Sequence, residues 1–163
     1  MHKFLSICIV LLSIFVFLEF LHPIPSTNPD IWTHLLLGKV IIYSHQVPQI
    51  NLLSYTHPHF PFINSHWLSE VLFYFIFQLG KFNGLIILGA ILGTFTYVLL
   101  FLFVRKRVSL HSLLIAGIVA SLILFERTDI RPELFSFLFL SIFKLHSIAT
   151  RKKLLHGFFF LFS

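Results

Sequence analysis

The sequence predicts an all-α membrane protein with several membrane-spanning helices and one long polar loop on the outer side. Hydrophobic residues make up 57% of the 163 residues and charged residues only 11%, whereas soluble domains carry roughly 25% charged residues. Several apolar segments approach the roughly 20 residues that a helix needs to cross a bilayer. A long stretch rich in His, Asn and aromatic residues separates the first two of these segments. These three observations together predict the polytopic fold.

The first predicted element is the apolar segment 4–21, which we expect to span the membrane. A cleaved signal peptide would have a similar composition, but the next residues are His-Pro-Ile-Pro and include no small-residue cleavage site. We therefore interpret the segment as a retained signal anchor with the N-terminus in the cytoplasm. The single cysteine, Cys8, lies inside this segment, so a disulfide framework is excluded.

The second predicted element is the outer loop 22–83, in which we expect juxtamembrane helices near 30–44 and 67–79. Asn28 suits the N-cap of the first helix, Pro29 its first helical position and Asp30 its first turn. The segment 67–79 is apolar but shorter than a span, and a Gly-containing break at 80–84 follows it. Its length is typical of a helix that lies along the membrane surface.

The distribution of Lys and Arg favours this surface position for 67–79. If 67–79 lies on the surface, the inner side holds seven basic residues, namely Lys3 and the triplets 105–107 and 151–153. The outer side then holds four, namely Lys39, Lys81, Arg127 and Arg131. If 67–79 spanned the membrane, these counts would be reversed, against the excess of Lys and Arg expected in cytoplasmic loops. The loop 126–133 is therefore expected on the same outer side as the loop 22–83.

The remaining predicted spans are 84–104, 108–125 and 134–149, with the start of a further span at 154–163. A span that stopped after a few residues would leave backbone groups unpaired in the bilayer, so we expect the chain to be the N-terminal part of a larger protein. The net charge of +6 does not indicate nucleic-acid binding, because the basic triplets directly follow apolar segments.

Two pairs of polar residues in the outer loop are candidates for a site. Asp30 and His34, the candidate catalytic residues, are four residues apart. His66 and Glu70, candidates for binding of substrate or phosphate, repeat this spacing. On a helix this spacing places both side chains on one face, where they can share a proton or a divalent cation. Two ligands alone do not define a metal site. The ordinary alternatives are that Asp30 complements the helix dipole and that aromatic-flanked polar residues anchor the chain at the interface.

The second outer loop contributes Asp129, Arg131 and Glu133. Pro132 and Glu133 suit the start of the last complete span. A cation at a helix N-terminus is electrostatically unfavourable, so we expect Arg131 to have an anionic partner: a phosphate, a lipid headgroup or a carboxylate such as Asp129. The planar guanidinium of Arg suits phosphate in particular. The alternative is an interfacial Arg that contacts the phosphates of bulk lipid.

Four segments between Asn28 and Phe143 carry a resemblance to a known superfamily of membrane enzymes. Their sequences are DIWTHLLLGK, NLLSYT, INSHWLSEVLFY and RPELFSF. Their order, behind a first span, is similar to the start of the GT-C glycosyltransferases, and more narrowly to a bacterial branch with strings such as Asp-Ile-Trp-Trp-His and His-Glu-Trp-Leu. The resemblance implies transfer of a sugar from a polyprenyl-phosphate donor on the outer membrane face. It implies Asp30 as the first-loop acid that acts on the acceptor, Asp129 and Glu133 as second-loop acids, and Arg131 as a phosphate partner.

The sequence departs from this pattern at two places. Ser65-His66-Trp67-Leu68 stands where the branch has His-Glu-Trp-Leu, and Ile31 follows Asp30 where the protein mannosyltransferases have a second acid. Either departure predicts a changed acceptor or an inactive relative. The alternative function is a non-enzymatic lipid or polymer transporter or an assembly scaffold. The expected partners are a lipid-linked sugar donor and membrane lipids. No cofactor is assigned, and a divalent cation is an open alternative.

Overall fold

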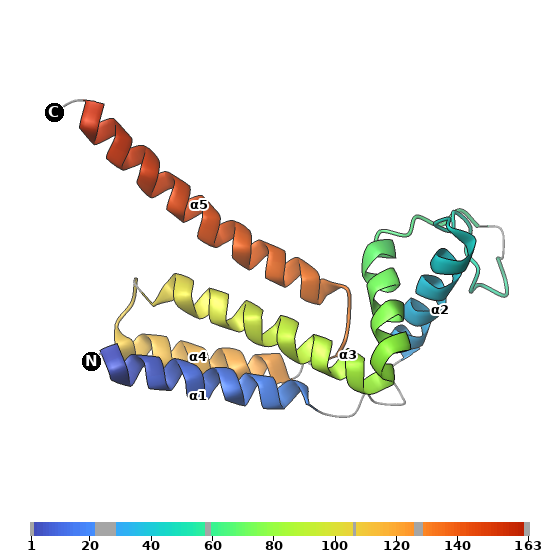
Figure 1. The fold of residues 1–163 in the computed structure, drawn as a ribbon, viewed down its shortest axis with the longest axis horizontal. Coiled ribbons are helices and arrows are strands. Elements are labelled where there is room, and N and C mark those ends of the chain that lie inside the picture. Colours follow the sequence, from blue (N-terminus) through green and yellow to red (C-terminus); the bar gives the residue numbers. More distant parts are fainter. Residues whose placement is uncertain (1, 22–28, 58–59, 106, 126–128, 162–163) are drawn as a thin grey trace. The chain divides into compact units, whose positions relative to one another are not determined.

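The computed structural model describes residues 2–21, 29–57, 60–105, 107–125 and 129–161. Over these residues the fold is all-helical, which confirms the predicted class, and it contains no strand beyond an isolated bridge between Ile50 and Pro61. The helices are drawn in Figure 1. They are α1 (His2–Phe20), α2 (Pro29–Ser44), α3 (Trp67–Val104), α4 (Leu110–Phe125) and α5 (Glu133–Leu161).

The chain forms two compact units. The first, which we call the loop unit, comprises His22–Gly89 and Asp129–Pro132, and so holds α2, the loop after it and the first part of α3. The second, which we call the bundle unit, holds α1, the rest of α3, α4 and α5. Residues predicted to act together on the outer side are therefore found mainly in one unit.

The start of α2 agrees with its sequence signals. The helix begins at Pro29 with Asp30 in its first turn, because proline has no N–H to satisfy at that position and an acid there complements the helix dipole. The expected N-cap, Asn28, lies outside the described residues. At the other end, His45 has a positive φ of 54° directly after Ser44, as in helices that end with a left-handed residue.

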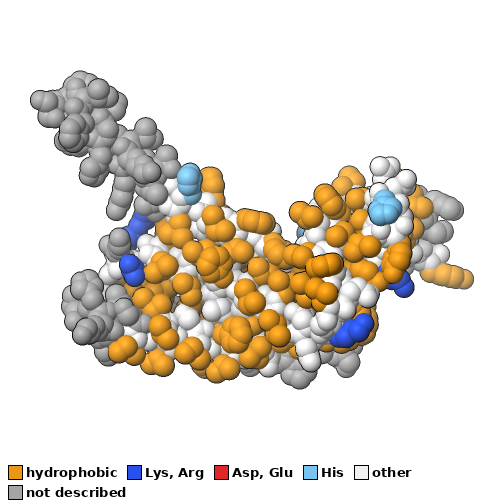
Figure 2. Space-filling model, in the orientation of Figure 1, with side chains coloured by type: hydrophobic (Ala, Val, Ile, Leu, Met, Phe, Trp, Pro, Cys, Tyr) orange, Lys and Arg blue, Asp and Glu red, His pale blue; other side chains and the backbone are white. Residues whose placement is uncertain are grey.

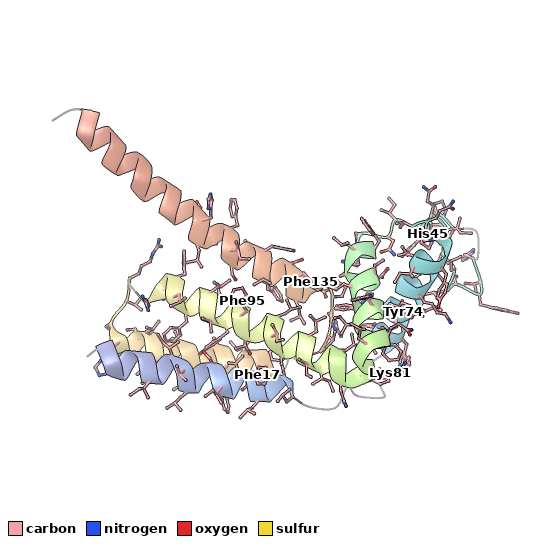
Figure 3. The ribbon with its side chains drawn as sticks, in the orientation of Figure 1. Phe17, His45, Tyr74, Lys81, Phe95 and Phe135 are labelled. Atoms are coloured by element: carbon pink, nitrogen blue, oxygen red, sulfur yellow. The ribbon has the colours of Figure 1, made fainter. Side chains whose placement is uncertain are left out.

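The break predicted at 80–84 corresponds to a kink at Lys81. The non-helical angles of this residue (φ 50°, ψ −143°) separate two helical segments within α3. The Lys81 ammonium lies 5.2 Å from the centre of the Phe77 ring, and Phe82 packs edge-on against both Phe77 and Trp32. Figure 3 labels Lys81 at the bend of α3. Aromatic packing therefore holds this strained residue in place.

Close packing of α2 against α3 sets the geometry of the loop unit. A Cβ on Gly38 would overlap the backbone carbonyl of Glu70, so only glycine allows the two helices to approach this closely. Ile31 and Phe73 are fully buried at this contact. Tyr74, labelled in Figure 3, lies on the same part of α3. Desolvation is the largest cause that raises its pKa, and a hydrogen bond with Tyr43 is the next.

The bundle unit has a small core and a largely apolar outer surface. Helix α1 packs along α4, the Phe20 ring lies against Gly93, and the Tyr97 hydroxyl donates to the Gly117 carbonyl at 2.9 Å. Large apolar side chains of α1, α4 and α5 nevertheless remain exposed, among them Leu11, Ile115 and Phe139 at 60–64%. Figure 2 shows apolar side chains over most of the visible face.

One helix of the described part of the chain, α3, is long and apolar enough to cross a membrane. The apolar helical segments Ile7–Phe20 and Leu110–Ile123 are shorter. Helix α5 continues from Glu133 through the basic triplet 151–153, where we expected two spans to be separated. The arrangement in several spans therefore stays a prediction.

Candidate functional site

A buried carboxylate links three parts of the loop unit. Glu70, in the first turn of α3, is only 2% exposed. Its Oε1 lies 3.0 Å from Nδ1 of His34 on α2, and its Oε2 accepts a hydrogen bond of 2.6 Å from Nδ2 of Asn64 in the loop before α3. Both carboxylate oxygens therefore have a donor, as a buried charge requires.

Asn64 connects this carboxylate to the backbone at the start of α3. Its Oδ1 accepts a hydrogen bond of 3.0 Å from the backbone N–H of His66, while its Nδ2 binds Glu70. The side chain is 8% exposed. Asparagine favours such turns because its amide can bind backbone two residues on. Asn64 was not among the site residues expected from the sequence. An Asn just before a helix that carries an acid in its first turn is nevertheless a sequence pattern that could have indicated it.

The ring of His34 is fixed on several sides. The ring centres of Phe73 and His66 each lie 6.3 Å away in edge-on orientation, and the His34 side chain is 15% exposed. An ionised carboxylate can only accept, so with Glu70 ionised the hydrogen of this bond is on Nδ1 of His34. In that tautomer the other ring nitrogen, Nε2, is the one that can accept a proton.

A second cluster joins the two polar loops. The Arg131 guanidinium lies 3.3 Å from Oδ2 of Asp30 and 3.5 Å from Oδ2 of Asp129. These side chains are between 34% and 49% exposed, so the ion pairs are partly solvated and individually weak. Ile130, between the two charged residues, is buried and anchors the segment. The predicted anionic partner of Arg131 is, in this structure, a pair of carboxylates.

The two clusters share one helix. Asp30 and His34 lie one turn apart on α2, and this spacing places them on the same face. One face of the first two turns of α2 therefore carries a partly exposed ion-pair cluster next to a buried histidine–carboxylate pair.

The remaining predicted site residues have different positions. Glu70 is paired with His34 from another helix, and His66, its predicted partner one turn away, contributes its backbone N–H and a ring contact. Glu133 is exposed in the first turn of α5, in the bundle unit. Among the described residues, no group of three or more His, Cys, Asp or Glu side chains could hold a metal ion.

Two hollows of the described part of the loop unit lie toward the other end of α2. One of about 590 Å³ is lined by Val40, Ser44 and residues 46–50 and 52. Another of about 420 Å³ is lined by Ile41, Ile42, residues 45–47, Trp67 and Val71. Neither includes a side chain of the two polar clusters. The candidate chemistry therefore rests on the clusters rather than on these hollows.

Family models, curated proteins and solved structures provide no match to this chain.

Proposed function

We propose that this chain belongs to a membrane glycosyltransferase that moves a sugar from a polyprenyl-phosphate donor to an acceptor hydroxyl at the outer membrane face. The observation that carries the proposal is the contact of Arg131 with Asp30 at 3.3 Å. It joins the first and the second polar loop in one cluster, and so supports the view that both loops contribute to one site on one side of the membrane.

The exposed apolar surface supports a position in the lipid bilayer. Large aliphatic and aromatic side chains line the outer faces of α1, α4 and α5. Each fully exposed side chain of this kind costs about 1.5–3 kcal/mol in water relative to burial, and contiguous exposed patches of this kind mark interaction or membrane surfaces. In the proposed arrangement lipid covers these faces, the N-terminus is cytoplasmic and the loop that carries Asp30 is outside.

The residues of the two clusters suit the chemistry of sugar transfer. The acceptor oxygen forms a bond to the anomeric carbon, the bond from that carbon to the phosphate oxygen breaks, and the polyprenyl phosphate leaves with the electron pair. The acceptor proton passes to a base on the enzyme. Arg131 stabilises the charge that develops on the leaving phosphate, and its partly exposed ion pairs allow it to exchange a carboxylate oxygen for a phosphate oxygen.

A structural function of the ion-pair cluster is the competing explanation. Arg131 already has two carboxylate neighbours within 3.5 Å, so the cluster could simply hold the segment Asp129–Pro132 against α2. A transporter or scaffold would use the cluster in this way. This alternative predicts that exchange of Arg131 affects assembly without any effect on a chemical step.

The proposal is tested with membranes that contain the full-length protein and polyprenyl phosphates that carry radiolabelled hexoses or aminosugars. Movement of label from the lipid to the aqueous phase or to an endogenous acceptor measures transfer. We expect transfer by the native protein and a loss of at least about tenfold for Arg131→Ala and for Asp30→Asn. Lys39→Ala, an exposed change on the same helix, is the control. Transfer that Arg131→Ala leaves unchanged at equal expression would exclude this site.

A further inference from the structure

We propose that Nε2 of His34 accepts the proton of the acceptor hydroxyl, and that Glu70 and Asn64 are the positioning residues that hold His34 for this step. This inference rests on the proposed function. It differs from what the resemblance implies, which is an acid of the first outer loop, Asp30, as the group that acts on the acceptor.

The hydrogen-bond network around Glu70 determines the orientation of His34. Glu70 uses Oε1 for His34 and Oε2 for Asn64, and Asn64 in turn uses its Oδ1 for the backbone N–H of His66. Rotation of either the carboxylate or the amide would break at least one of these bonds inside a buried region, where an unpaired polar group costs about 1–3 kcal/mol. The network therefore keeps the hydrogen on Nδ1 and leaves Nε2 with its lone pair.

The packing of α2 against α3 holds this pair at a constant distance. Gly38, one turn after His34, lies directly against the backbone of Glu70, so the two helices cannot separate or slide without loss of this contact. The edge-on rings of Phe73 and His66 also limit rotation of the imidazole. A base that is fixed before the substrate binds needs little reorganisation during the reaction.

The environment of Asp30 suits a different function. Its Oδ2 lies 3.3 Å from the guanidinium of Arg131, and its side chain is 49% exposed. This ion pair assigns Asp30 to the cluster that holds Arg131. In the proposed division, Asp30 positions Arg131 toward the donor phosphate, and His34, one turn further along α2, faces the acceptor.

The proton balance of the step is complete. The acceptor hydroxyl loses its proton to Nε2 as its oxygen bonds to the anomeric carbon, and His34 becomes an imidazolium. The Glu70 carboxylate, 3.0 Å from Nδ1, compensates this positive charge while it remains ionised, as in histidine–carboxylate pairs of hydrolases. The proton then returns to water after the product leaves.

The decisive experiment compares variants of the full-length protein in the same membrane assay, with transfer rates measured against donor concentration and pH. For His34→Gln we expect a loss of kcat of about 10²- to 10⁴-fold, a donor KM within about threefold of the native value, and disappearance of the acidic limb of the pH profile. For His34→Ala we expect added imidazole to restore part of the activity. The imidazole rescue separates a lost base from a structural effect.

The positioning residues are tested by pairs of variants. Glu70→Gln and Asn64→Ala should lower kcat by about 10- to 100-fold with little change in KM, as observed when groups that orient a functional histidine are removed. Glu70→Asp, which keeps the carboxylate, should recover part of this loss. Size-exclusion profiles and tryptophan emission identify any variant that fails to fold, and for such a variant the imidazole rescue of His34→Ala decides.

The outcomes separate the two proposals. Native-like kcat in His34→Gln, together with loss of transfer in Arg131→Ala, overturns the function of His34 and leaves the proposed sugar transfer intact. Absence of transfer by the native protein with every donor overturns both. Loss of transfer in His34→Gln with imidazole rescue of His34→Ala, at a normal donor KM, establishes His34 as the base.

Discussion

The charged side chains of the loop unit bond between distant residues, whereas serines of the bundle unit bond within their own helices. In the bundle unit, Ser13, Ser121 and Ser141 donate to carbonyls three or four residues earlier on their own helices. In the loop unit, His34 and Glu70 are 36 residues apart in the sequence. Arg131 contacts Asp30, which lies much earlier in the sequence. A bond within one helix forms as soon as that helix forms, whereas a bond between distant residues requires the folded unit.

The difference is clearest for the two buried carboxylates. Both oxygens of Glu70 have hydrogen-bond partners, whereas Oε2 of Glu19 on α1 has none among the described residues. A buried charge is expensive unless it is bonded. Glu70 is therefore bonded into its unit, whereas Oε2 of Glu19 has no hydrogen bond among the described residues to offset its burial. The following predictions test this comparison in order of expected effect.

The largest effect is expected for Glu70→Ala. The change leaves His34 and the buried amide of Asn64 without their partner, and loss of one member of a buried pair costs about 3–5 kcal/mol. Thermal unfolding of the protein in detergent, followed by tryptophan emission, measures the loss, because both tryptophans, Trp32 and Trp67, lie in the loop unit.

The matched control for this prediction is Glu19→Gln. Removal of a charge whose Oε2 has no partner should leave stability unchanged or raise it. Circular dichroism follows the helices of both units in the same samples, so it reports on Glu19→Gln as well. Equal destabilisation by Glu70→Ala and Glu19→Gln would contradict the comparison.

An intermediate effect is expected for Gly38→Ala. The new Cβ would overlap the backbone carbonyl of Glu70, and backbone cannot move aside as a side-chain end can. We expect a loss of about 1–3 kcal/mol, together with a lower kcat because His34 and Glu70 move apart. Gly80→Ala, on α3 in the same unit, is the control, since nothing lies within 4 Å of its Cβ. The two variants should unfold at clearly different temperatures in the tryptophan assay.

The smallest effect is expected for Ser121→Ala in the bundle unit. The serine hydroxyl donates to the carbonyl of Ile118 on the same helix at 2.8 Å. Removal of the hydroxyl leaves this carbonyl within the backbone hydrogen bonding of α4. We expect a change within about 0.5 kcal/mol, measured by circular dichroism during thermal unfolding. A loss of 2 kcal/mol or more would show that this hydroxyl has a tertiary function.

Local sequence signals determined the positions of several elements. The all-helical class, the start of α2 at Pro29 and the interruption of α3 near Gly80 follow from composition, helix-capping preferences and glycine placement. Each signal acts over a few residues, so the sequence is sufficient to place it. The confinement of this interruption to one residue, Lys81, was not predictable from local signals. It depends on aromatic packing that includes Trp32 of another helix.

The partners within the site were decided by tertiary structure. The sequence alone placed Asp30 with His34, and His66 with Glu70, at helical spacings, and it left the partner of Arg131 open among anions. Packing of α2 against α3 at Gly38 selects His34 as the partner of Glu70, and folding of Asp129–Pro132 into the loop unit brings Arg131 to Asp30. The physical reason is that helical periodicity fixes which side chains share a face, whereas only the contact between two helices determines what that face meets.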